Sequence, residues 1–189
     1  DVDADAQGDV FVTGIFEGNI DLTTAGIASA SDTSRGDMFL VKLSGKDGTH
    51  LLSKGFGDNP FEDGFQQLGV SVNVDAGSAV IAAGNVMGTV DFGGGEIETH
   101  GGFDVAVMKQ GPSGDHLWSK RFGDGGDQFV CDSRVDAEGN IFLAGFFYGT
   151  IDFGSGPLTS EADMSGRSAD MFLTKLDPDG RCIWSRTFP

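Results

Sequence analysis

An internal repeat constrains this chain more than any other feature of its sequence. Three copies of an apolar run that ends in glycine recur, and each glycine is followed seven residues later by an aspartate. The three runs are residues 10–14, 80–84 and 141–145. Each copy closes on a phenylalanine, and these phenylalanines are 66 residues apart twice (56 to 122 and 122 to 188). A long period of this kind is typical of arrays in which each copy is one supersecondary unit that stacks on its neighbours.

Each unit is predicted to contain four β-strands. The first strand alternates polar and apolar residues, the second is the apolar run above, the third is apolar and follows an aspartate, and the fourth is more polar. These strands are expected at residues 70–75, 80–84, 104–109 and 116–122 of the second unit and at the equivalent positions of the other two. The first strand of the first unit is truncated to residues 2–5. Helical spacing of apolar residues is absent, and 31 glycines among 189 residues also disfavour helix.

The apolar character of the middle strands predicts how the units pack. Nearly continuous apolar runs in the second and third strands indicate burial on both faces, whereas the fourth strand is suited to an outer edge. Four antiparallel strands with such a centre are typical of sheets stacked face to face, as in the blades of a β-propeller. The sequence therefore predicts an all-β propeller segment over residues 1–189, with blades at 1–57, 68–123 and 129–189.

The best-preserved unit carries a family resemblance. Its motifs are VDAEGNIFLAG at 135–145, DMFLTKLDPDG at 170–180 and IWSR at 183–186. They resemble the bacterial SBBP-type β-propeller repeat, and the likeness extends over essentially the whole chain. It implies a large secreted or surface protein and little about activity. The first unit departs from the pattern with Leu52 where the others carry Trp. A weaker likeness to pyrroloquinoline quinone propellers transfers no cofactor-binding residue.

Three blades do not complete a ring, because propellers have about four to eight. Open apolar blade faces would meet water over an area larger than soluble monomers tolerate. Either further blades of a longer parent chain or a second copy must cover them. The truncated first strand indicates an excised piece, and we expect this piece to form a six-bladed homodimer, because half-rings related by a two-fold axis close on each other.

The net charge limits the classes of partner. With 29 Asp and Glu against 12 Lys and Arg, the formal charge is −17, which repels the phosphates of nucleic acids and anionic lipids. Apolar stretches of only a few residues exclude insertion in a membrane as a helix, which needs ~20. The chain opens with neither a signal sequence nor an initiator Met, as expected for a mature or excised product. The resemblance to SBBP-type repeats implies an extracellular or envelope location.

Candidate binding residues lie on the variable loops. The loops between the second and third strands have 15, 12 and 17 residues, and they share one side of the fold with the connections between units. Such loops on a rigid scaffold are the usual place for binding a glycan or a protein. Their carboxylates and carbonyls predict a Ca²⁺ site, and a solvated acidic surface is the simpler alternative. The candidates are Asp58, Glu62, Asp63, Glu96, Glu98, His100, Asp124, Asp127, Glu161, Asp163 and Arg167.

Other aspartates are predicted to be structural. Asp5, with its equivalents Asp75 and Asp136, ends the first strand of each unit and should form a turn. The start of the chain is not a calcium loop, because glycine is at position 8 instead of 6 and no Glu occupies position 12. The third strands begin at Asp37, Asp104 and Asp170, which should bind backbone amides.

No nucleophilic catalytic motif is present in the sequence. Trp118 and Trp184 occupy one repeat position, which indicates blade packing instead of sugar stacking. Cys131 and Cys182 lie on the first and fourth strands of one blade, ~14 Å apart, so we expect free thiols. We therefore expect a non-catalytic binding or scaffolding module. The alternatives are a propeller hydrolase or lyase acting on polysaccharide through a carboxylate pair, and a purely structural repeat.

Overall fold

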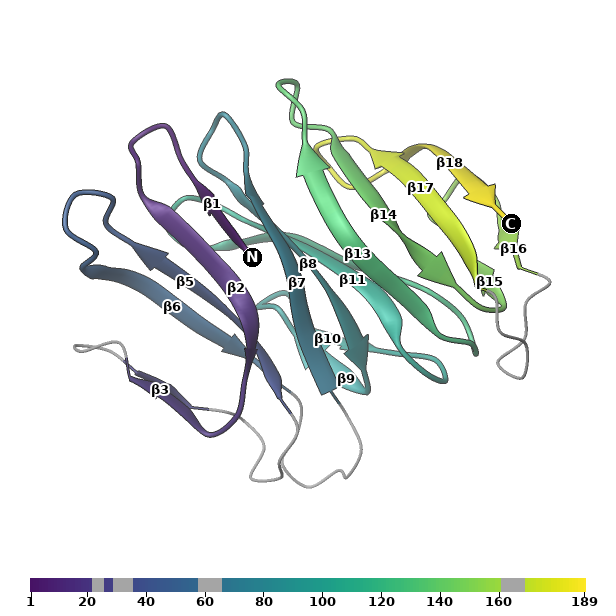
Figure 1. Ribbon diagram of the computed structural model, residues 1–189, viewed down its shortest axis with the longest axis horizontal. Coiled ribbons are helices and arrows are strands. Elements are labelled where there is room, and N and C mark those ends of the chain that lie inside the picture. Colours follow the sequence, from purple (N-terminus) through teal and green to yellow (C-terminus); the bar gives the residue numbers. More distant parts are fainter. Residues whose placement is uncertain (22–25, 29–35, 58–65, 161–168) are drawn as a thin grey trace.

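The computed structural model describes residues 1–21, 26–28, 36–57, 66–160 and 169–189, and these form β-strands without any helix. Three four-stranded antiparallel sheets, one for each unit, are arranged side by side along the molecule (Figure 1). The all-β prediction with three four-stranded units is thus confirmed. In the described part of the chain no helix has the length and hydropathy that crossing a membrane requires.

The strands of each sheet follow the order of the chain. The first sheet contains β1 (Val2–Ala4), β2 (Val10–Phe16), β5 (Asp37–Leu43) and β6 (His50–Phe56). The second sheet contains β7 (Gln66–Val74), β8 (Val80–Met87), β11 (Asp104–Gln110) and β12 (His116–Phe122). The third sheet contains β13 (Gln128–Val135), β14 (Ile141–Phe147), β17 (Asp170–Leu176) and β18 (Cys182–Phe188). The more polar fourth strand of each unit lies at a sheet edge, as predicted.

Each unit also has a short two-stranded ladder that the sequence did not predict. These ladders pair β3 (Asn19–Asp21) with β4 (Gly26–Ala28), β9 (Thr89–Asp91) with β10 (Glu96–Glu98), and β15 (Thr150–Ile151) with β16 (Leu158–Thr159). They occur between the second and third strands of each unit. We call the side with these ladders and the connections between units the loop side, and the opposite side the turn side (Figure 1).

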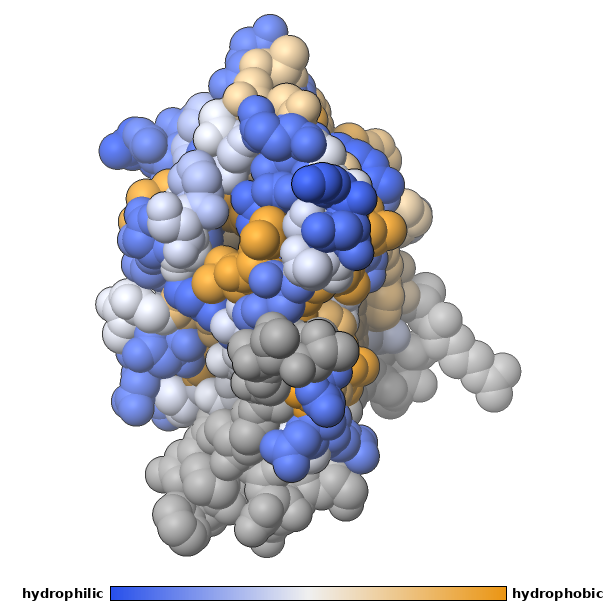
Figure 2. Space-filling view, turned by 90° about the vertical axis from the view of Figure 1, so that its left-hand side faces the viewer, coloured by the Kyte–Doolittle hydropathy of each residue, from blue (hydrophilic) through white to orange (hydrophobic). Residues whose placement is uncertain are grey.

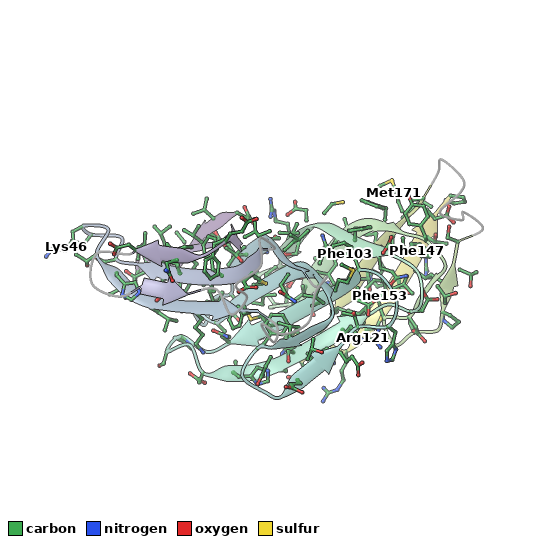
Figure 3. All side chains as sticks on the ribbon, turned by 90° about the horizontal axis from the view of Figure 1, so that it is seen from below. Lys46, Phe103, Arg121, Phe147, Phe153 and Met171 are labelled. Carbon is green, nitrogen blue, oxygen red and sulfur yellow. The ribbon has the colours of Figure 1, made fainter. Side chains whose placement is uncertain are left out.

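Two hydrophobic cores hold the three sheets together. The first includes Phe11, Leu40 and Phe56 of the first sheet with Val72 and Met108 of the second. The second core joins the second and third sheets, and its largest members are aromatic. Phe153 lies 5.0 Å from both Phe122 and Phe172, measured between ring centroids. Figure 3 shows Phe147 and Phe153 inside the molecule, whereas Met171 projects from the outer surface of the third sheet.

Burial on both faces is most complete in the middle sheet. Every residue of β11 is buried, and β8 is buried except at its last residue. In β14 buried and partly buried residues alternate strictly, because only one face of the third sheet has a neighbour among the described residues. In β5 of the first sheet the adjacent Leu40 and Val41 are both buried. The prediction that these strands are buried on both faces is therefore correct for the second unit and for β5 of the first, and wrong for the third. The described sheets do not close into a ring.

A buried polar cluster joins the first strands of the second and third sheets. Asn73 Nδ2 donates to Ser133 Oγ at 2.7 Å and to the Ser133 carbonyl at 3.1 Å. Ser133 Oγ in turn donates to Ser71 Oγ at 2.8 Å. All three side chains are buried. Because buried polar groups are costly unless paired, this cluster fixes the lateral position of one sheet against the next.

Candidate functional site

The aspartates that end the first strands form turns on the turn side, as predicted. In the third unit Asp136 Oδ1 accepts the backbone N–H groups of Glu138 at 3.1 Å and Asn140 at 2.8 Å. Asp5 and Asp75 accept the corresponding amides in their own turns.

A lysine from the third strand completes each of these turns. Asp136 Oδ2 is 3.0 Å from Lys175 Nζ, and the equivalent pairs are Lys42 with Asp5 and Lys109 with Asp75. The side-chain hydrogen bond from Asn140, assisted by Lys175, lowers the pKa of Asp136 to about 2. At Asp75 burial raises the pKa, but the hydrogen bonds of Lys109 and of the turn outweigh it, and the pKa is lowered. These carboxylates are occupied structurally and are not available to a ligand.

Five of the predicted binding residues lie in the described chain, all on the loop side. Glu96 and Glu98 are exposed on β10, and His100 is exposed just after it. Asp124 and Asp127 are partly buried in the connection between the second and third sheets. The other candidates lie outside the described residues: Asp58, Glu62, Asp63, Glu161, Asp163 and Arg167.

Asp124 and Asp127 hold the connection between two units. Asp124 Oδ1 accepts the N–H of Gly126 at 2.8 Å, and its Oδ2 accepts the N–H of Thr150 at 2.9 Å. Asp127 Oδ1 accepts the N–H of Phe103 at 2.8 Å. Both carboxylates thus bind backbone amides of neighbouring loops, which is a structural role that the acidic composition alone did not reveal.

His100 belongs to a polar group that the sequence did not predict. Arg121, at the end of β12, places Nη1 2.7 Å from Asp104 Oδ2 and Nη2 3.2 Å from His100 Nδ1. Asp104 Oδ2 also accepts the N–H of His100 at 3.1 Å, which confirms for this residue the predicted binding of a backbone amide. Burial raises the pKa of Asp104, although the hydrogen bond from Arg121 acts in the opposite direction. Figure 3 shows Arg121 at the surface.

The described residues do not by themselves form a metal site. No group of three or more His, Cys, Asp or Glu side chains suited to a metal ion occurs in the described ranges. Glu96 and Glu98 are two exposed carboxylates on one short strand, separated by a single residue. A Ca²⁺ ion takes six to eight oxygen ligands, so these two would need loop carbonyls and further carboxylates to complete the site.

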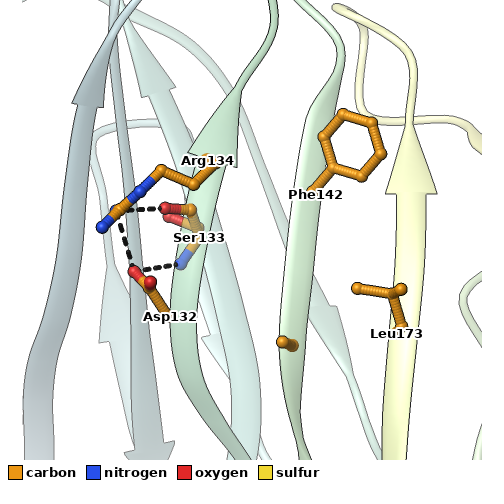
Figure 4. Close-up of a pocket in the computed structure, with 6 residues that line it drawn as sticks. Asp132, Ser133, Arg134, Phe142 and Leu173 are labelled. Carbon is orange, nitrogen blue, oxygen red and sulfur yellow. Dashed lines mark hydrogen bonds and ion pairs between the residues drawn. The ribbon is translucent and has the colours of Figure 1, made fainter.

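A shallow pocket of about 160 Å³ lies on the outer face of the third sheet. Phe142, Ala144 and Leu173 line its floor, and Asp132, Ser133 and Arg134 of β13 form one wall (Figure 4). Asp132 Oδ1 accepts the N–H of Ser133 at 2.8 Å and pairs with Arg134 Nη1 at 2.9 Å. The pocket thus holds one carboxylate, already paired with a guanidinium, and no second acid to form a catalytic pair.

Both cysteines are free thiols, as predicted from the separation of their strands. Cys131 is exposed on β13, and the partial burial of its thiol, together with the neighbouring Asp132, raises the pKa of that thiol. Cys182 on β18 is partly buried against the core between the second and third sheets. A raised pKa keeps the Cys131 thiol protonated at neutral pH, where thiols react slowly.

Comparison with known proteins adds no family to this picture: no protein-family model matches the chain, and no curated protein matches its sequence.

Proposed function

We propose that this chain is a three-bladed β-propeller segment of the SBBP type that serves as a non-catalytic binding or scaffolding module outside the cell. Its ligand face is the loop side, and a glycan or a protein is the ligand class that such loops suit. Calcium is the candidate ion, held by loop carboxylates and carbonyls.

One observation carries the proposal: the units are alike on the turn side and differ on the loop side. On the turn side, the same aspartate and lysine pair recurs in all three units. On the loop side, the loops differ in length. The exposed Glu98 of the second unit, which pairs with Thr89, is replaced in the third unit by Thr159, which pairs with Thr150. A constant scaffold with one variable side is the arrangement of binding modules.

A polysaccharide hydrolase or lyase has weaker support. Such enzymes use two carboxyl groups about 5–10 Å apart on either side of the bond to be cleaved. The pocket of the third sheet contributes only Asp132, and Arg134 pairs with it. On the loop side, Asp124 and Asp127 already accept backbone hydrogen bonds.

Calorimetric titration with Ca²⁺, together with a glycan array, tests this proposal. We expect saturable binding of Ca²⁺ and weaker binding in the Glu96→Gln, Glu98→Gln double variant. The matched control is Glu138→Gln, an exposed glutamate of the turn side, which should bind as the wild type does. No heat with Ca²⁺ and a blank array would overturn the proposal in favour of a purely structural repeat.

A further inference from the structure

Equivalent residues of the three units differ in exposure according to whether another sheet follows. Phe56 and Phe122 end the fourth strands of the first and second sheets and are 4% and 6% exposed. Phe188, at the same position of the third sheet, is 51% exposed. A second repeat position behaves in the same way: Met38 1%, Val105 0% and Met171 58%.

A third repeat position shows that this exposure is not simply a property of the outer strand. Leu51, Leu117 and Ile183 lie near the start of the fourth strands, and they are 49%, 49% and 50% exposed. Their exposure does not change when a following sheet is present. The exposed Phe188 and Met171 therefore mark a surface that the repeat is built to cover, and Ile183 lies outside it.

The described interfaces also show which polar groups bind the following unit. Lys120 Nζ donates to the carbonyl of Gly180 at 2.6 Å, and Lys54 donates to the carbonyl of the equivalent Gly114. Trp118 Nε1 donates to the carbonyl of Pro178 at 3.1 Å, two residues before that glycine. In the third sheet the equivalent donors are Arg186 and Trp184.

These two donors have no following turn to bind within the described chain. Arg186 is exposed and Trp184 is partly buried. Among the described residues, Arg186 Nη1 donates to the carbonyl of its neighbour Ser185, at 2.8 Å.

The first sheet offers the matching acceptor. A Cβ atom at Gly114 would lie 2.7 Å from Leu52, and one at Gly180 would lie 3.0 Å from Trp118, because each turn packs on the preceding sheet. The equivalent Gly48 is exposed, and no atom lies within 4 Å of its Cβ position. All three glycines have the positive φ of this turn, so Gly48 has the shape required to receive an indole ring.

The first strands repeat the same pattern near the inner edges of the sheets. Asp1 Oδ2 accepts the N–H of Val72 at 3.0 Å, and Ser71 Oγ accepts the N–H of Ser133 at 3.2 Å. Asp132 occupies the same repeat position in the third sheet as Asp1 and Ser71 do in the first two. If a first sheet followed the third, the N–H that Asp132 would accept in this way would be that of Val2, the equivalent of Val72.

The side chain of Val2 is exposed, because no described sheet precedes the first sheet. It is 61% exposed, whereas Val72 is 1% exposed. Figure 2 looks onto the left-hand side of Figure 1, where the first sheet lies, and shows hydrophobic residues among hydrophilic ones.

We propose that the outer face of the third sheet binds the outer face of the first sheet in a second copy of this chain. Trp184 packs on the Gly48 turn and donates to the Lys46 carbonyl, and Arg186 donates to the Gly48 carbonyl. This inference rests on the propeller architecture proposed above. Propellers have about four to eight blades, and six is the only multiple of three in that range, so two copies close the ring about a two-fold axis.

Light scattering during gel filtration tests this inference. We expect a mass near twice 19.7 kDa. Trp184→Ala and Arg186→Glu should each weaken dimerisation at least about 30-fold, the loss typical of a central Trp or Arg in an interface. Val2→Asp, on the opposite face, should have the same effect. Because Arg186 is exposed, its variant retains the fold of the single chain even if the Trp184 variant does not.

Two variants of the third unit serve as controls. Ile183→Ala removes an equally exposed apolar side chain next to Trp184, and Arg181→Glu makes the same charge change as Arg186→Glu on an exposed arginine. Both should remain dimeric. A stable wild-type monomer overturns the inference. A series of larger species overturns the closed pair, and a dimer that Arg186→Glu leaves intact shows that a different surface associates.

The two proposals fail in different ways. A monomer that binds Ca²⁺ or a glycan would refute the dimer alone. A dimer that binds neither Ca²⁺ nor a glycan would refute the ligand-binding role alone.

Discussion

Replacing Phe122 and Phe188 separately with alanine measures the difference between a covered and an open sheet face. The two residues occupy the same position in successive units, so the backbone and the residue type are matched. Phe122 is 6% exposed and its ring lies 5.0 Å from that of Phe153. Phe188 is 51% exposed on the outer face of the third sheet.

The expected free energies of unfolding follow from this burial. Phe122→Ala removes a buried ring and leaves a cavity, which costs about 3–5 kcal/mol. Burying a whole Phe side chain contributes about 1.5–3 kcal/mol, so a half-exposed Phe188 contributes about 1–1.5 kcal/mol. No enclosed cavity forms at Phe188, because that face is open. The free energies of unfolding of the two variants should differ by about 1.5–4 kcal/mol.

Urea denaturation followed by tryptophan fluorescence provides the assay. It must be run at a concentration low enough for light scattering to give the mass of one chain, with the slope of the transition compared between variants. Equal destabilisation by the two substitutions would refute the reasoning, because it would mean that the outer face of the third sheet is covered within a single chain. At higher concentration the dimer predicts that Phe188→Ala becomes more destabilising.

Three further substitutions test individual contacts. Ser133→Ala leaves the buried Asn73 amide without its 2.7 Å acceptor and should cost about 1–3 kcal/mol in urea denaturation. The pKa of Asp136 is lowered from 3.8 to about 2 by the hydrogen bonds of its turn, so wild-type stability falls as the pH drops from 3.8 toward 2. Unfolding measured across that range should show this part of the pH dependence missing in Asp136→Asn. Gly180→Ala adds both positive-φ strain and a contact 3.0 Å from a tryptophan ring, so its melting temperature should fall further than that of Gly8→Ala, whose Cβ meets no atom within 4 Å.

The repeat accounts for how much of the fold could be predicted. Most strands of the large sheets have seven or more residues, which is long enough to show alternation or an apolar run. Each of these patterns also recurs in three units. The ladders of the loop side have strands of two or three residues, too short to show any period. The apolar run of β14 predicts burial on both faces, and this is wrong for the third unit, because a sequence pattern shows what a strand is suited to contact and not whether the contacting sheet is present.

The candidate site was predicted less well for a different reason. Charge alone makes Asp124 and Asp127 candidates for ligand binding, but in the structure they bind backbone amides of other loops. Arg121 lies 21 residues from His100 in the chain, on an outer strand that appeared to serve only as a sheet edge. Such contacts depend on which loops lie next to one another in the fold. Neither the spacing of residues in the sequence nor their composition predicts which loops these are.

The lysines of the first two fourth strands give the array a direction. Lys54 reaches forward to the second unit and Lys120 reaches forward to the third, and the aspartate and serine of the first strands also point forward. Both described interfaces therefore join a forward face to the turn and first strand of the next unit through the same positions. A gene that duplicates one such unit lengthens the array without inventing a new interface, because the copy arrives already complementary to both of its neighbours.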